Sequence, residues 1–288
     1  MTTLNSNNET VFPYSYWSNS LSKHNQGYQN VSPYPHIVLD NFLAVDSINK
    51  AFKEFPRIND SSWINYLHIN ERKHGLNNTA SFPLSIQSII NELNSKKFLC
   101  FLSELTGIEN LIADTNLEGG GLHQSQRGGF LNIHADFTAH PHHKNWRRRV
   151  NLIIYLNPDW EDNYCGHLEL WSKDMKQCVQ KITPVFNRCV IFNTDADSFH
   201  GHPDKLNCPP EMTRKSIALY YYTVEKDKVF TRSTNYKPRP GDGIKRVWIY
   251  MDKLALSLYT KIKSKFGLSD DFASRVLKLL SFSRSAKK

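Results

Sequence analysis

Two residues whose side chains can bind a metal ion lie two positions apart in the segment Ile133-His134-Ala135-Asp136-Phe137. Side chains alternate between the two faces of an extended strand, so His134 and Asp136 are expected to point the same way, about 7 Å apart along the backbone. One imidazole and one carboxylate on one face supply two of the three protein ligands of a catalytic metal site. The third ligand must come from elsewhere in the chain.

That third ligand is expected to be a histidine, because two histidines and one carboxylate on one face of an octahedron form the ligand set of non-haem Fe(II) sites that activate oxygen. The segment from Asp197 to His202 supplies two candidates, His200 and His202. Both would point to the same face of an extended strand, so the spacing alone leaves the choice open. Fourteen residues after His200, Arg214 precedes a largely apolar run.

This order of residues resembles the 2-oxoglutarate and Fe(II)-dependent oxygenase superfamily, in particular its prolyl-4-hydroxylase-like branch. The resemblance runs from about Gly119 to Thr223, about a third of the chain. It is carried by five segments, which are HADF, RRRVNLIIYLNPDW, CGHLELW, NRCVIFNTDADSFHGHPD and TRKSIALYYYT.

The resemblance implies that His134, Asp136 and His200 are the iron ligands and the catalytic residues. His200 is favoured over His202 because it immediately precedes a glycine, as in the family pattern; His202 would then lie near the iron or the substrate. Arg214 is implied to bind the distal carboxylate of 2-oxoglutarate, with Ser216 beside it. A guanidinium suits this role because it is permanently charged and can donate two parallel hydrogen bonds to a carboxylate.

The remainder of the co-substrate site departs from the family pattern. Relatives often place a tyrosine that touches 2-oxoglutarate on the strand before the His-x-Asp pair, where this chain has His123, Gln124 and Gln126. We expect one of these polar side chains to replace the tyrosine, with His123 and Gln124 as the candidates for co-substrate binding. Tyr155, on a strand expected across the barrel, is a further candidate.

We therefore expect an enzyme that uses Fe(II), 2-oxoglutarate and O₂ to hydroxylate a C–H bond, releasing succinate and CO₂. By analogy with prolyl hydroxylases, the substrate is expected to be a peptidyl or free amino acid, with proline as the first candidate. Two alternatives are a non-catalytic jelly-roll binding or regulatory module with a basic C-terminal contact surface, and a zinc hydrolase on the same scaffold. The Arg214-x-Ser216 pair disfavours the binding module, because a structural metal has no use for a carboxylate partner.

Short apolar or alternating runs from Leu111 onward predict antiparallel strands. Together with the resemblance they indicate an α+β fold with a mainly β core, a double-stranded β-helix (jelly roll) with flanking helices at both ends. The expected domains are a poorly ordered lead-in (1–30), an oxygenase domain (31–225, with helical support about 44–107 and a jelly-roll core about 111–225), and a connector with C-terminal helices (226–288).

Two helix boundaries are predicted from local signals. Asp46 is expected to cap a helix that runs to about Phe55, and Gly107 is expected to end a helical region that starts near Pro83. The lid residues that choose the substrate are expected in the loops 59–78 and 141–147. C-terminal helices are expected from about Ile244 to Ile262 and after Ser269.

The chain carries a formal net charge of +9, and the last 28 residues contain eight basic and two acidic residues. Such an excess could mark nucleic acid or an anionic membrane surface as a partner, but a solvated helix face and tail is the favoured interpretation. The five cysteines show no CxxC spacing and are expected to be reduced thiols. The start of the chain lacks a signal-peptide pattern and no apolar run reaches membrane-spanning length, so we expect a cytoplasmic protein.

Overall fold

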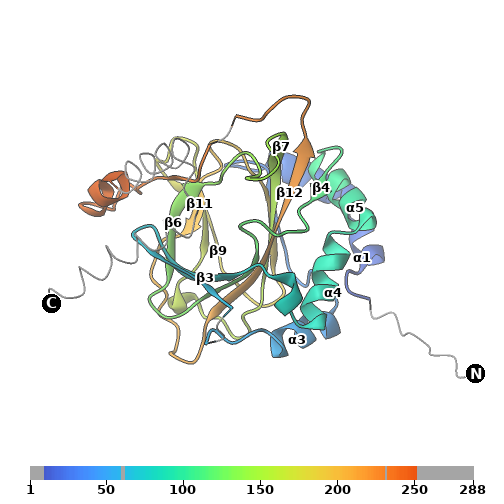
Figure 1. Cartoon of the computed structure of the whole chain (residues 1–288), viewed down its shortest axis with the longest axis horizontal. Coiled ribbons are helices and arrows are strands. Elements are labelled where there is room, and N and C mark those ends of the chain that lie inside the picture. Colours follow the sequence, from blue (N-terminus) through green and yellow to red (C-terminus); the bar gives the residue numbers. More distant parts are fainter. Residues whose placement is uncertain (1–9, 60–61, 231, 252–288) are drawn as a thin grey trace, which may run out of the picture. The chain divides into compact units, whose positions relative to one another are not determined.

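The structure of the protein, a computed structural model, describes residues 10–59, 62–230 and 232–251 (Figure 1). The chain divides into two compact units, Met1–Asp242 and Gly243–Lys288. All strands that the structure describes lie in the first unit. In the second unit residues 245–251 are helical; the remainder of the helix expected to Ile262, and the helix expected after Ser269, lie outside the described residues.

The sheet contains thirteen strands, and every pair of neighbouring strands is antiparallel. The strands are β1 (His36–Leu39), β2 (Ile64–His68), β3 (Glu71–Leu76), β4 (Ile112–Ala113), β5 (Gly121–Ser125), β6 (Phe130–Ala135), β7 (Trp146–Tyr155), β8 (Leu168–Trp171), β9 (Cys178–Ile182), β10 (Cys189–Asn193), β11 (His200–His202), β12 (Arg214–Val224) and β13 (Asn235–Tyr236).

The sheet curls into a half-barrel because β3 joins its two halves. The order along the main path is β1-β10-β7-β12-β5-β3-β6-β11-β8-β9, with β2 on β3, β4 on β12 and β13 on β6. One end of β3 pairs with β5 and the other end pairs with β6, so β6 and β11 face β7 and β12 across the interior (Figure 1). This architecture confirms the predicted jelly-roll core with flanking helices on its N-terminal side.

The helices cover one face of the β7–β12 half of the sheet (Figure 1). They are α1 (Tyr14–Ser18), α2 (Leu21–Asn30), α3 (Val45–Lys53), α4 (Leu84–Leu93) and α5 (Lys96–Thr106). Two short 3₁₀ turns, η1 (Thr79–Ser81) and η2 (Asp162–Tyr164), lie in the connections between other elements. Strand alternation sorts the side chains. Those in the core with the helices are Val150, Leu152, Ile154, Ile217, Leu219 and Tyr221, and those facing the interior pocket are Asn151, Ile153, Ser216, Ala218 and Tyr220.

The expectation of a poorly ordered lead-in over residues 1–30 is wrong for its described part. Residues 14–18 and 21–30 form α1 and α2, anchored by the buried aromatic rings of Phe12, Trp17 and Tyr28. The Trp17 indole donates to the Phe42 carbonyl (3.0 Å), and the Tyr28 hydroxyl donates to Asn193 (2.6 Å). The polar composition of this segment predicts disorder, but a few widely spaced aromatic residues bury enough apolar area to hold both helices in place.

The helix boundaries agree with the predictions at one position and differ at the other. Gly107 follows α5 in the left-handed conformation (φ 69°) that glycine adopts most easily, as predicted. The N-cap of α3 is Ala44, so Asp46 lies in the first turn, where its charge still favours the helix N-terminus. Among the described residues, no helix has both the length and the apolar character needed to cross a bilayer.

Candidate metal centre and its pocket

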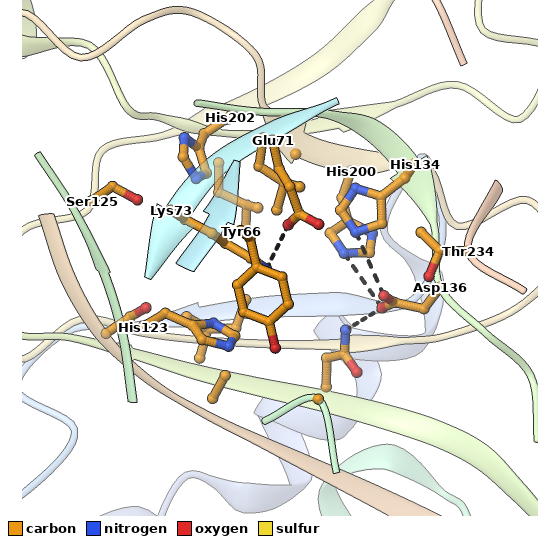
Figure 2. A pocket seen from close by; sticks show the side chains of 18 of the residues that line it. Tyr66, Glu71, Lys73, His123, Ser125, His134, Asp136, His200, His202 and Thr234 are labelled. Atoms are coloured by element: carbon orange, nitrogen blue, oxygen red, sulfur yellow. Dashed lines mark hydrogen bonds and ion pairs between the residues drawn. The ribbon is translucent and has the colours of Figure 1, made fainter. Parts of the chain in front are cut away.

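Three side chains that can bind a metal ion converge at the interior of the half-barrel (Figure 2). His134 lies on β6, Asp136 follows the end of that strand, and His200 lies directly opposite His134 on β11. The Nε2 atoms of His134 and His200 are each 3.5 Å from an oxygen of Asp136. One ligand atom from each residue lies within 4.8 Å of the others, and all three residues are buried.

Backbone hydrogen bonds fix the orientation of both imidazoles. His134 Nδ1 lies 2.9 Å from the carbonyl of Asn132, and His200 Nδ1 lies 2.9 Å from the carbonyl of Ser198. A carbonyl can only accept, so each Nδ1 donates its proton to the backbone, and each Nε2 faces the carboxylate of Asp136. Burial lowers the pKa of His200 to about 4, although the charge of Asp136 opposes this change, so its ring is neutral near pH 7.

Asp136 is held as a carboxylate by a buried arginine. Burial alone would raise the pKa of Asp136, but Arg148, helped by the two histidines, holds it well below its usual range. Arg148 Nη2 lies 3.0 Å from Asp136 Oδ2. Asn151 accepts hydrogen bonds from Arg148 (2.7 and 2.9 Å) and donates to the same carboxylate oxygen (2.7 Å). Asp136 Oδ1 carries neither of these bonds.

A β-bulge brings Arg148 to the pocket. Between β7 and β12, Val150 pairs with Tyr221 but Arg148 pairs with Tyr222, so Arg149 is the extra residue. Regular alternation would place Arg148 on the face that packs against the helices; the bulge turns it inward instead. Its side chain is only 1% exposed, and its guanidinium lies 3.4 Å from the centre of the Tyr220 ring.

The chemistry of this donor set fits a divalent metal ion bound on one face. Two imidazoles whose Nε2 atoms lie near the carboxylate of Asp136 form, together with that carboxylate, the 2-His-1-carboxylate set that leaves further coordination positions open. His134, Asp136 and His200 would hold such an ion. Orienting partners surround every member of the set, as is usual at metal centres.

A pocket of about 180 Å³ adjoins the metal centre, and Arg214 lies in its wall. Arg214 Nε donates to the Gly166 carbonyl (2.8 Å) and its Nη2 to the Tyr155 hydroxyl (3.3 Å). Among the described residues no carboxylate pairs with Arg214, and burial lowers its pKa. Ser216 lies on the same face of β12 and lines the pocket too. A buried guanidinium without a counter-charge is a site for an anion.

The two candidates on β5 lie on opposite faces of that strand. His123 lines the pocket, whereas Gln124 points away from it and donates to the Thr213 hydroxyl (2.7 Å). This position does not support the co-substrate role predicted for Gln124, because adjacent residues of a strand point to opposite faces and His123 is the one that lines the pocket. Burial and the nearby Lys73 lower the pKa of His123 to about 3, so its ring is neutral.

His202 lines the pocket without joining the metal-binding group. The pairing of β11 with β6 is irregular between His200 and His202, so the two rings do not take equivalent positions. The group of side chains close enough to share an ion contains His200. His202 is buried, and its Nδ1 has no hydrogen-bond partner among the described residues.

Several pocket residues carry no recognisable motif in the sequence. Arg148 reaches the pocket through a bulge that nothing in a run of three arginines indicates. Tyr66, Glu71 and Lys73 come from β2 and β3, within the segment 59–78 where lid residues are expected. The residues of the second expected lid, 141–147, do not line the pocket.

Comparison with known proteins places these residues in a family context. Residues 120–222 match the model of the 2OG-Fe(II) oxygenase superfamily. Over 198 residues the chain is 25% identical to the mouse prolyl 3-hydroxylase OGFOD1, a match that covers 67% of this chain and 33% of the mouse protein. The chain thus spans about a third of the length of this curated relative.

A solved structure shares the fold. It is a prolyl hydroxylase from Trichoplax adhaerens in complex with a peptide fragment of the hypoxia inducible factor oxygen degradation domain. The TM-score is 0.53 at 17% sequence identity, and the match covers 72% of this chain and 92% of that chain. The likeness supports the jelly-roll assignment.

Proposed function

Because this chain belongs to the 2-oxoglutarate and Fe(II)-dependent oxygenase superfamily, whose members use Fe(II), 2-oxoglutarate and O₂, we propose that it hydroxylates a C–H bond of a prolyl residue. In this reaction substrate C–H, 2-oxoglutarate and O₂ become C–OH, succinate and CO₂. Fe(II), when bound, supplies the activation of O₂. His134, Asp136 and His200 would hold it.

The observation that carries the proposal is that Arg214, which has no carboxylate partner in the part of the chain that the structure describes, lies in the same pocket as the three metal-binding residues. A buried guanidinium whose described contacts are a carbonyl and a hydroxyl needs an anion to offset its desolvation. The distal carboxylate of 2-oxoglutarate provides one. Tyr155 and Ser216 supply hydroxyl groups on the same side, and His123 is the neutral group opposite Ser216 across the β5–β12 pairing.

The protein groups act by positioning. Arg214 would hold one end of the dicarboxylate, which places the keto-acid end at the metal centre. Arg148 and Asn151 keep Oδ2 of Asp136 engaged, so that Oδ1 would be the oxygen available to a metal ion.

Proline is proposed as the target because the names of both relatives specify prolyl hydroxylation. A peptide substrate is proposed because the Trichoplax enzyme is in complex with a peptide fragment. A binding module with a structural metal is disfavoured, since it would gain nothing from an unpaired buried arginine beside the metal.

The proposal is tested by anaerobic titration of the apoprotein with Fe(II) and then with 2-oxoglutarate. The expected result is a weak visible charge-transfer band that requires both additions and weakens in Arg214→Ala. Succinate formation in air should require the same two components. A wild-type protein that binds Fe(II) but gives no band with saturating 2-oxoglutarate would refute the proposal.

A further inference from the structure

The β2–β3 hairpin contributes a charged wall to the pocket. Tyr66, Glu71 and Lys73 line the same cavity as the metal centre (Figure 2). All three lie outside residues 120–222, the segment that matches the family model. The wall is therefore a feature of this chain that the family match does not describe.

Glu71 holds Lys73 within this wall. Glu71 Oε2 lies 3.1 Å from Lys73 Nζ, and the two side chains are 10% and 16% exposed. Glu71 Oε1 lies 2.7 Å from His68 Nε2 and accepts a hydrogen bond from the Tyr236 hydroxyl (3.4 Å). Burial would raise the pKa of Glu71, but Lys73 and His68 lower it well below its usual range, so the pair is fully charged.

Stability does not account for this ion pair. The free energy needed to remove two charges from water is about as large as the free energy gained from their attraction. Apolar replacements of similar volume are therefore often neutral or stabilising. A Lys ammonium has three N–H donors. Lys73 uses one on Glu71 and lies 5.2 Å from the centre of the Tyr66 ring, which leaves a donor for a group inside the pocket.

The charges of Glu71 and Lys73 indicate what kind of substrate group Lys73 can bind. Arg214 has no counter-charge among the described residues and suits an anion, whereas Lys73 is already neutralised by Glu71. A substrate carboxylate bound at Lys73 would be repelled by the Glu71 carboxylate. A neutral oxygen acceptor, such as an amide carbonyl, gains the hydrogen bond without that repulsion.

Gly75 leaves room for the ring of Tyr66 to cover this part of the pocket. A Cβ atom at Gly75 would lie 2.9 Å from Cε2 of Tyr66 and 3.6 Å from the ring of His123. The absence of a side chain lets the Tyr66 ring lie across β3, against the pocket. Tyr66 pairs directly with Lys73 between the two strands, so the ring and the ammonium are presented together.

We propose that Lys73, held by Glu71, is a specificity-determining residue that donates a hydrogen bond to an amide carbonyl adjacent to the target carbon, and thereby selects residues within a peptide over free amino acids. The inference rests on the proposed function, because it assumes that 2-oxoglutarate occupies the Arg214 end of the pocket. It assigns to Lys73 no part in binding 2-oxoglutarate.

The test compares two pools of probes in succinate formation by the Fe(II)-loaded enzyme. One pool contains acetyl-Gly-Xaa-Gly-amide tripeptides with all twenty residues at Xaa, and the other contains the twenty free amino acids. Capped peptides should stimulate the wild type, and Lys73→Met should lower this stimulation by about tenfold or more. The dissociation constant of 2-oxoglutarate, measured from the charge-transfer band, should stay within about twofold. Arg72→Met, an exposed neighbour on the same strand, is the control.

Glu71→Gln gives the opposite change. It leaves Lys73 as an unpaired cation, so free amino acids should gain about tenfold relative to capped peptides. Three results would overturn the inference: a large loss of 2-oxoglutarate affinity in Lys73→Met, equal stimulation of the wild type by both pools, or a band without stimulation by any capped peptide. Absence of the band from the wild type would instead refute the proposed function.

Discussion

Arg148 is the residue whose replacement should most change the metal centre without removing a ligand. Its guanidinium is the strongest influence that keeps the Asp136 carboxyl ionised despite burial. Arg148→Met keeps most of the apolar volume but removes the 3.0 Å ion pair and both hydrogen bonds to Asn151. Asp136 then loses its charge partner, its pKa rises, and Asn151 is free to rotate.

Two magnitudes follow from this geometry. Breaking a buried ion pair by removing one partner costs about 3–5 kcal/mol, so the apoprotein carrying Arg148→Met should lose roughly that much free energy of unfolding. Loss of a residue that orients a metal ligand lowers metal affinity about 10–100-fold, so the dissociation constant for Mn(II), used in place of Fe(II), should rise by that factor. The defect should deepen as the pH falls, because Asp136 then takes up a proton more readily.

The assay is calorimetric titration with Mn(II) together with denaturant unfolding, in parallel with Arg149→Met. Arg149 is the extra residue of the same bulge; it is 30% exposed and lies 3.9 Å from Glu225. An exposed pair of this kind is worth at most about 1 kcal/mol, so the control should bind Mn(II) like the wild type. If Arg148→Met binds Mn(II) as tightly as the control at equal pH, the assignment of Arg148 as the positioning residue of Asp136 is wrong.

Three further outcomes are expected. Tyr155→Phe removes a hydroxyl that contacts Arg214, so the dissociation constant of 2-oxoglutarate should rise about fivefold in the charge-transfer titration. An unchanged dissociation constant would show that this hydroxyl does not contribute to binding 2-oxoglutarate. Acid should destabilise the apoprotein between pH 6.5 and about 3, because burial holds the pKa of His123 near 3 in the folded chain while the unfolded chain takes up the proton near 6.5. The variant His123→Gln should reduce the change in the free energy of unfolding over this pH range, measured by denaturant unfolding at several pH values. Trp17→Ala should lower the free energy of unfolding by about 3–5 kcal/mol, measured by denaturant unfolding, because it removes a buried indole. Tyr16→Ala, at an exposed neighbouring position, should lower it little. Equal losses in the two variants would contradict the structural role of α1.

The sequence was most informative where chemistry and strand periodicity coincide. His134 and Asp136 share a face through simple alternation, and a distal histidine and arginine in fixed order complete a pattern that also predicts the jelly roll. The same alternation separates His123 from Gln124, so the sequence by itself already predicts that only one of the two side chains can face the pocket.

The remaining site residues were beyond sequence reasoning for physical reasons. Arg148 reaches the pocket through a bulge. One extra residue in a strand moves the side chains beyond it to the opposite face of the sheet, and the composition of the strand does not reveal this change. Glu71 and Lys73 acquire their role only because β3 bridges two halves of the sheet, which is a long-range property of the fold. The helices at 14–30 depend on aromatic anchors that a count of polar residues conceals.

The pairing of β6 with β11 also governs when in folding a metal ion can be bound. Strands β7 to β10 lie between them in the chain, so His200 meets His134 only when a long segment of chain has been closed into a loop. Contacts of such large sequence separation form slowly. A nascent chain that has emerged as far as Asp136 carries only two of the three candidate ligands, and the complete set arises only once β11 has been added. Metal binding at this centre would therefore follow folding, and a bound ion would slow unfolding of the native chain without guiding its early stages.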